Sequence, residues 1–197
     1  MNSSLFSKKL LNGYEIREMK DDDFWPLIEK HHLHVFQETI QFNWKDFAPE
    51  EYLEKTTELA KNMGQPFRLK LGVFKNEEFA GWSFGDQQSA ESYYMRNSAV
   101  LEAHRKKGLY SELLKANLEI LTMKGFQVIY SSHLATNNAI IIPKLKAGFV
   151  ITSLEVEERF GTRIKLTYYT NQLTKKIMDF RVGFSRPDKE LKDILKL

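Results

Sequence analysis

The sequence predicts one α/β domain of the α+β type, built on a mixed, mostly antiparallel sheet of about six or seven strands. Helices flank the sheet, and an extra helical tail follows it. Three apolar runs follow one another through short turns, at residues 67–74, 79–84 and 92–101, and strands joined in this way pair antiparallel. Segments with helical periodicity stand before and after these runs, at 50–63 and 109–124.

Length and composition fit a single domain with a sizeable core. The chain has 197 residues, of which 42% are hydrophobic and 28% charged, as is usual for a globular protein. We expect the domain to occupy residues 1–170. Residues 171–197 then form a C-terminal helical extension that packs on or beside it.

Charge and cysteine content exclude several classes of protein. The net charge of +3 is small and gives no reason to expect nucleic acid as a partner. The chain has no cysteine, so disulfides, thiolate metal sites and cysteine nucleophiles are excluded. No apolar run approaches the ~20 residues of a membrane span, and residues 1–7 lack the apolar core of a signal peptide. We expect a cytoplasmic protein that contacts no membrane.

The remaining elements follow from alternation, helical spacing and breakers. The predicted strands lie at 14–19, 67–74, 79–84, 92–101, 126–132, 150–158 and 163–169. The predicted helices lie at 24–38, 50–63, 109–124 and 138–147, with a final one from about 188. Asp21, Asp22 and Asp23 offer an N-cap and first-turn acids to the first helix, and Pro143 is expected to kink the fourth. The final helix either covers the domain or meets a second copy in a homodimer.

A basic turn separates the third run from the next helix. It contains Arg105, Lys106 and Lys107, at the point where the first helical amides have no partner. A helix N-terminus carries partial positive charge, so cations are unfavourable there unless an anion sits among them. We therefore predict a phosphate or pyrophosphate cradle, with Gly108 letting the backbone pass close to the ligand. The simpler interpretation is a solvated turn that leads into an ordinary core helix.

A second stretch favours the cradle. Residues 137–149 follow a buried-looking strand at 128–132. The two stretches together resemble the GNAT superfamily of acyl-CoA-dependent N-acyltransferases, in which an apolar strand ending in valine leads into an Arg/Gln-x-x-Gly-x-Gly/Ala turn and a helix. The matching residues are Val100, Arg105 and Gly108 in the first motif, and Asn137, Gly148 and Phe149 in the second. The resemblance covers about 68–169 well and 14–63 weakly.

The resemblance implies that acetyl-CoA is the co-substrate and that it lies between two strands that splay apart. Backbone groups at the end of one strand would bind the pantetheine and the thioester, and the turn would wrap the pyrophosphate. The cofactor-binding residues carried over in this way are Ala99, Val100, Leu101, Arg105, Lys106, Lys107, Gly108, Leu109, Tyr110, Ser111 and Asn137. Tyr110 replaces a small residue of the family, so we expect crowding near the phosphates.

The implied reaction is direct attack of an amine on the thioester. The amine must lose a proton, the oxyanion needs a donor, and the departing thiolate needs a proton or a positive charge. The amide near Val100 is the natural oxyanion donor. Lys144 stands where many family members have a tyrosine acid, and it either stabilises the thiolate or faces solvent. His133, whose ordinary pKa suits proton transfer, and Tyr94 and Tyr130 are the other candidates.

Two further groups of side chains invite functional interpretations. His31 and His34 share a helix face, but nothing nearby supplies an obvious third ligand. We interpret them as surface or acceptor-pocket histidines. Asp21, Asp22 and Asp23 could bind a metal, but helix capping is the simpler interpretation, so we expect no metal. An aromatic segment joins the first two helices, a region that borders the acceptor site in the family. Its rings either select the acceptor or pack in the core: Phe36, Phe42, Trp44, Phe47 and Tyr52.

The sequence therefore predicts an N-acetyltransferase that moves an acetyl group from acetyl-CoA to a primary amine of a small molecule or peptide. One alternative is a non-catalytic acyl-CoA-binding or sensing module of the same fold, because Lys144 replaces the usual acid. Another is a nucleotide-binding domain unrelated to CoA, although the missing second and third glycines argue against a Rossmann fold. The acceptor stays open among polyamines, amino acids, aminoglycosides and protein amines.

Overall fold

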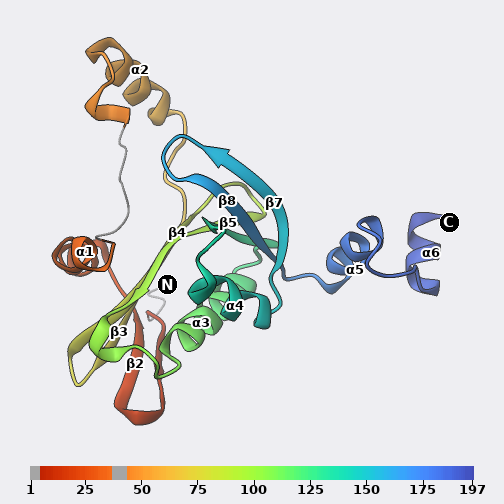
Figure 1. Ribbon diagram of the computed structural model, residues 1–197, viewed down its shortest axis with the longest axis horizontal. Coiled ribbons are helices and arrows are strands. Elements are labelled where there is room, and N and C mark those ends of the chain that lie inside the picture. Colours follow the sequence, from red (N-terminus) through yellow and green to blue (C-terminus); the bar gives the residue numbers. More distant parts are fainter. Residues whose placement is uncertain (1–4, 37–43) are drawn as a thin grey trace.

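The computed structural model describes residues 5–36 and 44–197 and contains one eight-stranded sheet in the order β1-β2-β3-β4-β5-β6-β8-β7, shown in Figure 1. The strands are β1 (Ser7–Lys9), β2 (Tyr14–Glu18), β3 (Arg68–Lys75), β4 (Glu78–Gln87), β5 (Ser92–Val100), β6 (Val128–Leu134), β7 (Val150–Glu157) and β8 (Gly161–Tyr169). The helices are α1 (Asp21–Val35), α2 (Glu50–Lys61), α3 (Leu109–Met123), α4 (Asn138–Lys146), α5 (Gln172–Arg181) and α6 (Lys189–Leu195).

The predicted fold class is confirmed. All neighbouring strands pair antiparallel except β5 and β6, which are parallel. The eighth strand, β1, was not predicted, because three polar residues carry no alternation that would mark a strand. It pairs with β2 from Ser7 opposite Arg17 to Lys9 opposite Glu15.

The start of α1 differs from the predicted cap. Lys20 occupies the cap position and makes no side-chain capping bond, so the three aspartates lie in the first turn, where acids favour the helix dipole. The Asp21 carboxylate is engaged elsewhere: it accepts from the Trp25 indole N–H at 2.7 Å and pairs with Lys70 at 3.1 Å. The helix ends at Val35, with Phe36 as its cap residue, and the predicted end at residue 38 lies outside the described residues.

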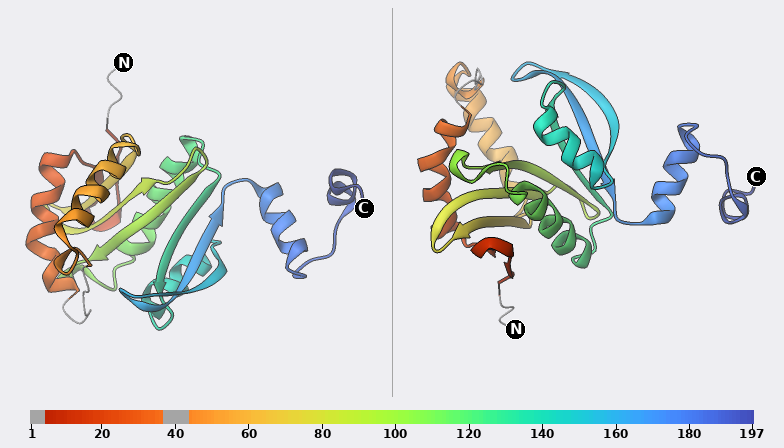
Figure 2. Two further views of the ribbon diagram at one scale, coloured as in Figure 1. Left: turned by 90° about the horizontal axis from the view of Figure 1, so that it is seen from above. Right: turned by 60° about the horizontal axis from the view of Figure 1, so that its bottom comes forward.

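Helices cover the sheet on both faces, as Figure 2 shows. The larger core cluster joins α3 and α4 to one face, with Leu113, Leu121 and Ile141 among its buried members. The smaller cluster joins α1 to the other face through Phe24 and Trp82. The buried residues of α1 and of α3 recur at helical spacing, so their burial against the sheet accounts for the layered arrangement.

A bulge changes the direction of side chains along β5. Phe84 faces Asn97 and Gly85 faces Met95, so Arg96 is an extra residue in the ladder. Before the bulge, Met95 belongs to the α3 cluster. After it, the odd-numbered Ala99 belongs to the α1 cluster. Odd-numbered residues of β5 therefore face α3 before the bulge and α1 after it.

The parallel pairing of β5 with β6 is short. It runs only from Ser92 opposite Val128 to Tyr94 opposite Tyr130. Beyond Tyr94 the two strands separate, and no strand of the described residues pairs with the β6-facing edge of β5 from residue 95 to 100. This is the splay that the family resemblance implied.

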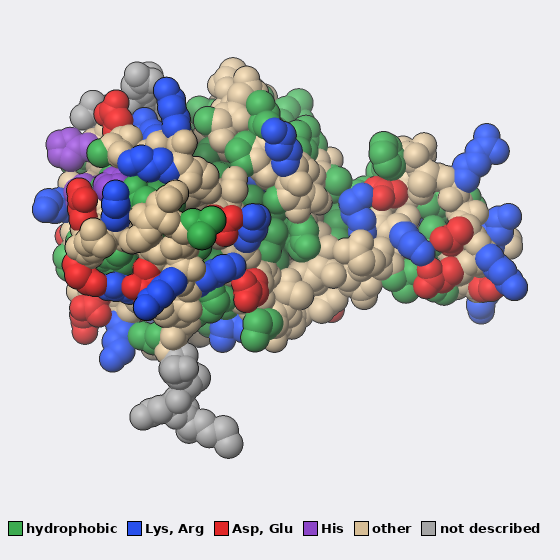
Figure 3. Space-filling view, turned by 90° about the horizontal axis from the view of Figure 1, so that it is seen from below, with side chains coloured by type: hydrophobic (Ala, Val, Ile, Leu, Met, Phe, Trp, Pro, Cys, Tyr) green, Lys and Arg blue, Asp and Glu red, His purple; other side chains and the backbone are tan. Residues whose placement is uncertain are grey.

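Three helices lie at the periphery. No residue of α2 is buried, and Figure 1 shows it above the hairpin of β7 and β8. Helices α5 and α6 extend beyond β8, and Figure 3 shows acidic and basic side chains mixed on this tail. Leu191 of α6 is buried. Within the described ranges, no helix is both long enough and apolar enough to span a membrane.

Trp82 offers a test of how the α1 face is held. Its indole is fully buried and donates to Asn97 Oδ1 at 2.7 Å. We expect Trp82→Phe to lower the free energy of unfolding by about 2–3 kcal/mol, because it opens a cavity in the core and removes the donor to the half-buried Asn97. Urea denaturation followed by circular dichroism measures this loss.

Trp25→Phe is the matched control. Its indole also donates a hydrogen bond, but to the exposed Asp21, so we expect a loss below about 1 kcal/mol. Equal losses for the two variants would show that the bond between Trp82 and Asn97 does not hold this face.

Candidate functional site

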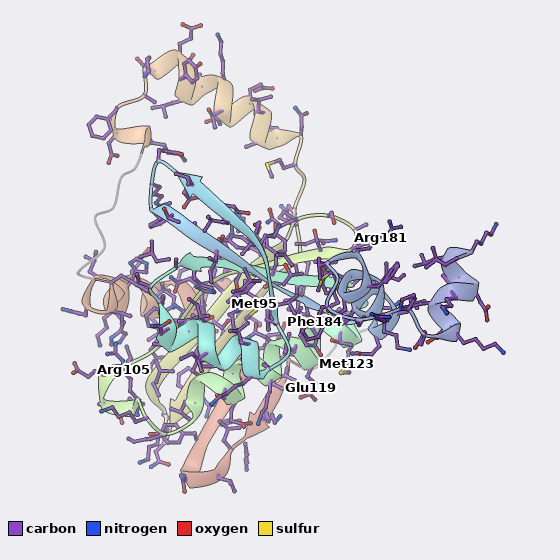
Figure 4. All side chains as sticks on the ribbon, turned by 45° about the vertical axis from the view of Figure 1, so that its right-hand side comes forward. Met95, Arg105, Glu119, Met123, Arg181 and Phe184 are labelled. Atoms are coloured by element: carbon purple, nitrogen blue, oxygen red, sulfur yellow. The ribbon has the colours of Figure 1, made fainter. Side chains whose placement is uncertain are left out.

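One cavity of about 620 Å³ lies where β5 and β6 separate. It is bounded by the edge of β5 from Met95 to Val100, by the turn before α3, by the first turn of α3, by one side of α4, and by Val35 and Phe36 at the end of α1. In Figure 4, the labels mark buried Met95 on β5 and exposed Arg105 in the turn. No carboxylate lines this cavity within residues 5–36 and 44–197.

The structure brings most of the predicted cofactor-binding residues to this cavity. Those that line it are Ala99, Val100, Arg105, Lys106, Gly108, Leu109, Tyr110, Ser111 and Asn137. Leu101 and Lys107 do not. The Lys107 ammonium turns back and donates to the Ala103 carbonyl at 2.9 Å and to the Tyr14 hydroxyl at 3.3 Å.

Gly108 sets the geometry of the turn. Its φ of 77° lies in the left-handed region, which glycine adopts without steric cost. A Cβ there would meet no atom within 4 Å, so the backbone conformation, not a close approach, requires glycine at this position. Because α3 begins at Leu109, its first amides have no helical acceptor. Three residues of this first turn, Leu109, Tyr110 and Ser111, line the cavity, which makes this helix end suited to an anion.

His104 is a residue that the sequence interpretation missed. It is buried and lines the cavity, and its Nδ1 lies 3.1 Å from the Tyr14 hydroxyl. The same hydroxyl accepts from Lys107, so β2 ties down both ends of the basic turn. A histidine directly before Arg105 reads as part of a solvated turn, and only the tertiary contact with Tyr14 shows otherwise.

The Val100 peptide faces the open edge of β5. The Leu101 N–H donates to Ala80 of β4 at 2.9 Å, and N–H groups alternate in direction along an antiparallel strand. The N–H of Val100 therefore points toward the separation between β5 and β6. Its carbonyl accepts from Arg105 Nε at 3.1 Å, which agrees with this direction.

Lys144 is buried inside the cavity and does not face solvent. Its side chain is 1% exposed. Its Nζ lies 3.4 Å from Met95 Sδ and 4.5 Å from the centre of the Phe149 ring, and among the described residues it has no carboxylate partner within 4.0 Å. Burial without a counter-charge lowers the pKa of Lys144 to about 7, because the charged form loses its hydration.

His133 lines the same cavity at the end of β6. Its Nε2 lies 2.9 Å from Ser131 Oγ. Burial, together with the positive charges of Lys144 and Arg163, lowers the pKa of His133 to about 3. The imidazole is therefore neutral at physiological pH.

Tyr94 and Tyr130 lie outside this cavity. Their rings stack with centroids 5.1 Å apart, and the Tyr94 hydroxyl accepts from Arg163 at 3.1 Å. Arg96 covers the Tyr94 ring at 5.4 Å. Because Tyr94 precedes the bulge, its side chain points to the face opposite Met95.

Tyr110 lines the cavity with a buried hydroxyl that has no hydrogen-bond partner among the described residues. Burial raises the pKa of this phenol, so it stays protonated. A buried donor without a partner is costly, and a ligand oxygen would satisfy it.

The remaining candidates divide between packing and undescribed positions. His31 packs on Phe79 with centroids 5.6 Å apart, and no group of three metal-ligating side chains gathers within the part of the chain that the structure describes. Phe36 lines the cavity, whereas Phe47 and Tyr52 are exposed. Phe42 lies outside the described residues, and the Trp44 side chain is likewise not described.

Comparison with solved structures supports the fold. The chain is similar to yncA from Salmonella typhimurium, solved with its cofactor acetyl-CoA, at 17% identity and a TM-score of 0.59, covering 82% of this chain and 96% of that one. It is similar to the ribosomal-protein-S18-alanine N-acetyltransferase from Escherichia coli at 19% identity and 0.58, covering 80% and 94%. It is also similar to a variant of the spermidine N-acetyltransferase SpeG from Vibrio cholerae, at 18% identity and a TM-score of 0.59, covering 84% of this chain and 98% of that one.

Sequence comparison identifies the family. No curated protein sequence matches the chain. The family model for the acetyltransferase (GNAT) family matches residues 30–149, which is more than half of the chain and includes both motifs and the cavity between them. The chain therefore belongs to the GNAT acetyltransferase family.

Proposed function

We propose that the protein transfers an acetyl group from acetyl-CoA to a primary amine by direct attack of the amine on the thioester. The observation that carries this proposal is that one cavity joins the N-terminus of α3, which suits an anion, to the unpaired edge of β5. Family membership and the likeness to yncA, whose structure holds acetyl-CoA, support acetyl-CoA as the donor.

The residues present suit this donor. The amides of Leu109, Tyr110 and Ser111 would bind the pyrophosphate, with charge added by Arg105 and Lys106. The orphan Tyr110 hydroxyl would donate to an oxygen of the same molecule. The free N–H and C=O groups of β5 would pair with the pantetheine amides as a neighbouring strand does. The volume of about 620 Å³ lies within the range of small-molecule sites.

The Val100 N–H would stabilise the negative charge that forms on the thioester oxygen. As the neutral amine nitrogen bonds to the carbonyl carbon, it gives up one proton to water, while the carbon–sulfur bond breaks and its electron pair leaves on sulfur. We assign the proton that sulfur takes up to the Lys144 ammonium, in place of the tyrosine common in the family. With a pKa of about 7, Lys144 carries this proton in a large fraction of molecules near neutral pH and gives it up readily.

His133 takes a smaller part in this proposal. A group with a pKa of about 3 accepts protons poorly at neutral pH. We therefore assign it to the wall of the site as a neutral imidazole. Tyr94 and Tyr130, which lie on the other face, are assigned no proton transfer. We also take residues 1–170 as the catalytic domain and 171–197 as an extension.

Ser111→Glu tests the cradle. Ser111 is exposed and lines the cavity in the first turn of α3. A glutamate there favours the helix dipole by up to about 1 kcal/mol, so the fold is maintained, but its charge repels a pyrophosphate. We expect calorimetric titration with acetyl-CoA to show affinity at least about tenfold weaker than in the wild type, with an unchanged or higher Tm.

Ser111→Gln is the control, because it has a similar size and no charge. It should retain most of the affinity. Equal weakening in both variants would contradict an electrostatic cradle and indicate only crowding. If the wild type binds acetyl-CoA but turns over no amine in a broad panel, the acyl-CoA-binding module is the better description.

Lys144→Met tests the proton donor. We expect kcat to fall about a hundredfold or more, as for loss of a general acid. The variant should also be more stable, by at least about 1 kcal/mol at neutral pH, because it removes an unpaired buried charge. Because the chain has no cysteine, a thiol-reactive dye reports CoA release without a background from the protein.

The pH dependence gives the sign of the stability effect. The pKa of Lys144 is lowered from its ordinary 10.5 to about 7, so the folded protein binds this proton less readily than the unfolded chain. The free-energy cost of burying the Lys144 charge is complete below pH 7 and disappears toward pH 10.5. The gain in Tm of Lys144→Met over the wild type should therefore shrink as the pH rises over this range. Lys146→Met, on the exposed side of α4, is the control and should change neither quantity. Full activity in Lys144→Met would rule out the assignment.

A further inference from the structure

A second cavity, of about 200 Å³, lies on the α1 face of the sheet. Its lining residues are Trp25, Arg68, Lys70, Phe84, Gly85, Asp86 and Arg96. Arg96, the extra residue of the β5 bulge, also lines the cavity of about 620 Å³ in which we place acetyl-CoA, and which we call the cofactor cavity. The two cavities therefore share one lining residue.

Three cations and one carboxylate line this second cavity. Arg96 forms a two-pronged ion pair with Asp86, which is buried. Lys70 pairs at 3.1 Å with Asp21, which does not itself line the cavity. Arg68 stands opposite Asp86 in the β3–β4 register and is exposed. Among the described residues Arg68 forms no ion pair within 4.0 Å, so its charge is available to a ligand.

Asp86 is not available to a ligand cation. One of its oxygens accepts from Arg96 Nε, and the other accepts from Arg96 Nη2 and from the amide of Gln88. Both oxygens are thus engaged, and a polyamine would meet the three cations without a free carboxylate. The cavity favours an anion.

The walls limit the size of that anion. Trp25 and Phe84 pack edge to face at 5.2 Å. Gly85 has no side chain, so it contributes only backbone to the cavity between Phe84 and Asp86. The volume is below that of usual drug-sized sites, and it suits a single carboxylate or phosphate with a short carbon chain.

Cations continue from Arg96 along the same face toward the separated strands. The stacked rings of Tyr94 and Tyr130 carry Arg96 at 5.4 Å on one ring and Lys165 at 4.1 Å on the other. A substrate that follows this face therefore passes one further cation, Lys165, beside the ion pair of Arg96 with Asp86.

We propose that the acceptor carries a carboxylate or a phosphate beside its primary amine, and that the second cavity binds this anion through Arg68, Lys70 and Arg96. The inference rests on the proposed acetyl transfer. The anion holds the acceptor on the α1 face, and the amine reaches past Arg96 into the cofactor cavity.

Matched acceptors test the charge requirement. Amino acids are compared with their amides, O-phosphoethanolamine with ethanolamine, and spermidine stands for the polyamines, all with acetyl-CoA and detection of released CoA. We expect the anionic member of a pair to have a kcat/KM at least about tenfold higher. The carboxylate and phosphate arms show which anion is used. Turnover of spermidine or of the neutral members with equal or higher kcat/KM would overturn the inference while leaving the acetyl transfer intact.

Arg68→Glu tests the site itself. It should raise KM for the anionic acceptor about fivefold or more, with kcat and the acetyl-CoA affinity unchanged and no effect on the neutral partner. Arg68→Gln is the milder variant, and Arg181→Glu on α5 is the control of equal charge change. An equal rise for anionic and neutral acceptors would contradict anion binding here.

A titration without turnover separates this inference from the proposed function. The indole N–H signal of Trp25, assigned by its loss in Trp25→Phe, should shift in NMR spectra when glycine or O-phosphoethanolamine is added, and Arg68→Glu should weaken that shift. If acetyl-CoA binds but no amine turns over, the proposed transfer fails, and this titration still decides whether the anion site exists. A Trp25 signal that neither anion moves would overturn it.

Discussion

The short pairing of β5 with β6 is the constraint on which the site depends. The strands pair only from Ser92 to Tyr94 on β5, so the rest of that edge keeps N–H and C=O groups without a neighbouring strand. Such groups need partners, and they line the same cavity as the unpaired amides that begin α3. Backbone geometry therefore builds most of the cofactor side of the site.

The bulge at Arg96 lets one strand serve two faces. Met95 before it packs with α3, and Ala99 after it packs with α1, so a single strand presents walls to both sides of the sheet. Arg96 itself borders both cavities. In the reaction that we propose, a donor on the α3 face and an acceptor on the α1 face would thus meet at the edge of β5 without crossing the sheet.

Sequence patterns predicted the parts of the molecule that depend on near neighbours. The seven longer strands and the basic turn before Leu109 follow from alternation, helical spacing and one glycine. The bulge, the direction of Tyr94 and the contact of His104 with Tyr14 depend on which strands lie side by side, which periodicity does not encode. The burial of Lys144 lies between these cases. Lys144 lies three residues after the buried Ile141 on the same helix face, which indicated burial. A charged lysine, however, ordinarily lies in solvent.

In the acetyl transfer that we propose, the charges around the cofactor cavity bear on how the amine is activated. Arg105 and Lys106 stand at its rim and Lys144 inside, and no carboxylate among the described residues lines it. Such a field favours the negative charge of the oxyanion and the thiolate. It also disfavours an ammonium ion, which lowers the pKa of an entering amine. Loss of the amine proton is then promoted by the cavity as a whole. A low-pKa His133 is compatible with this arrangement, because the site does not depend on a strong base at that position.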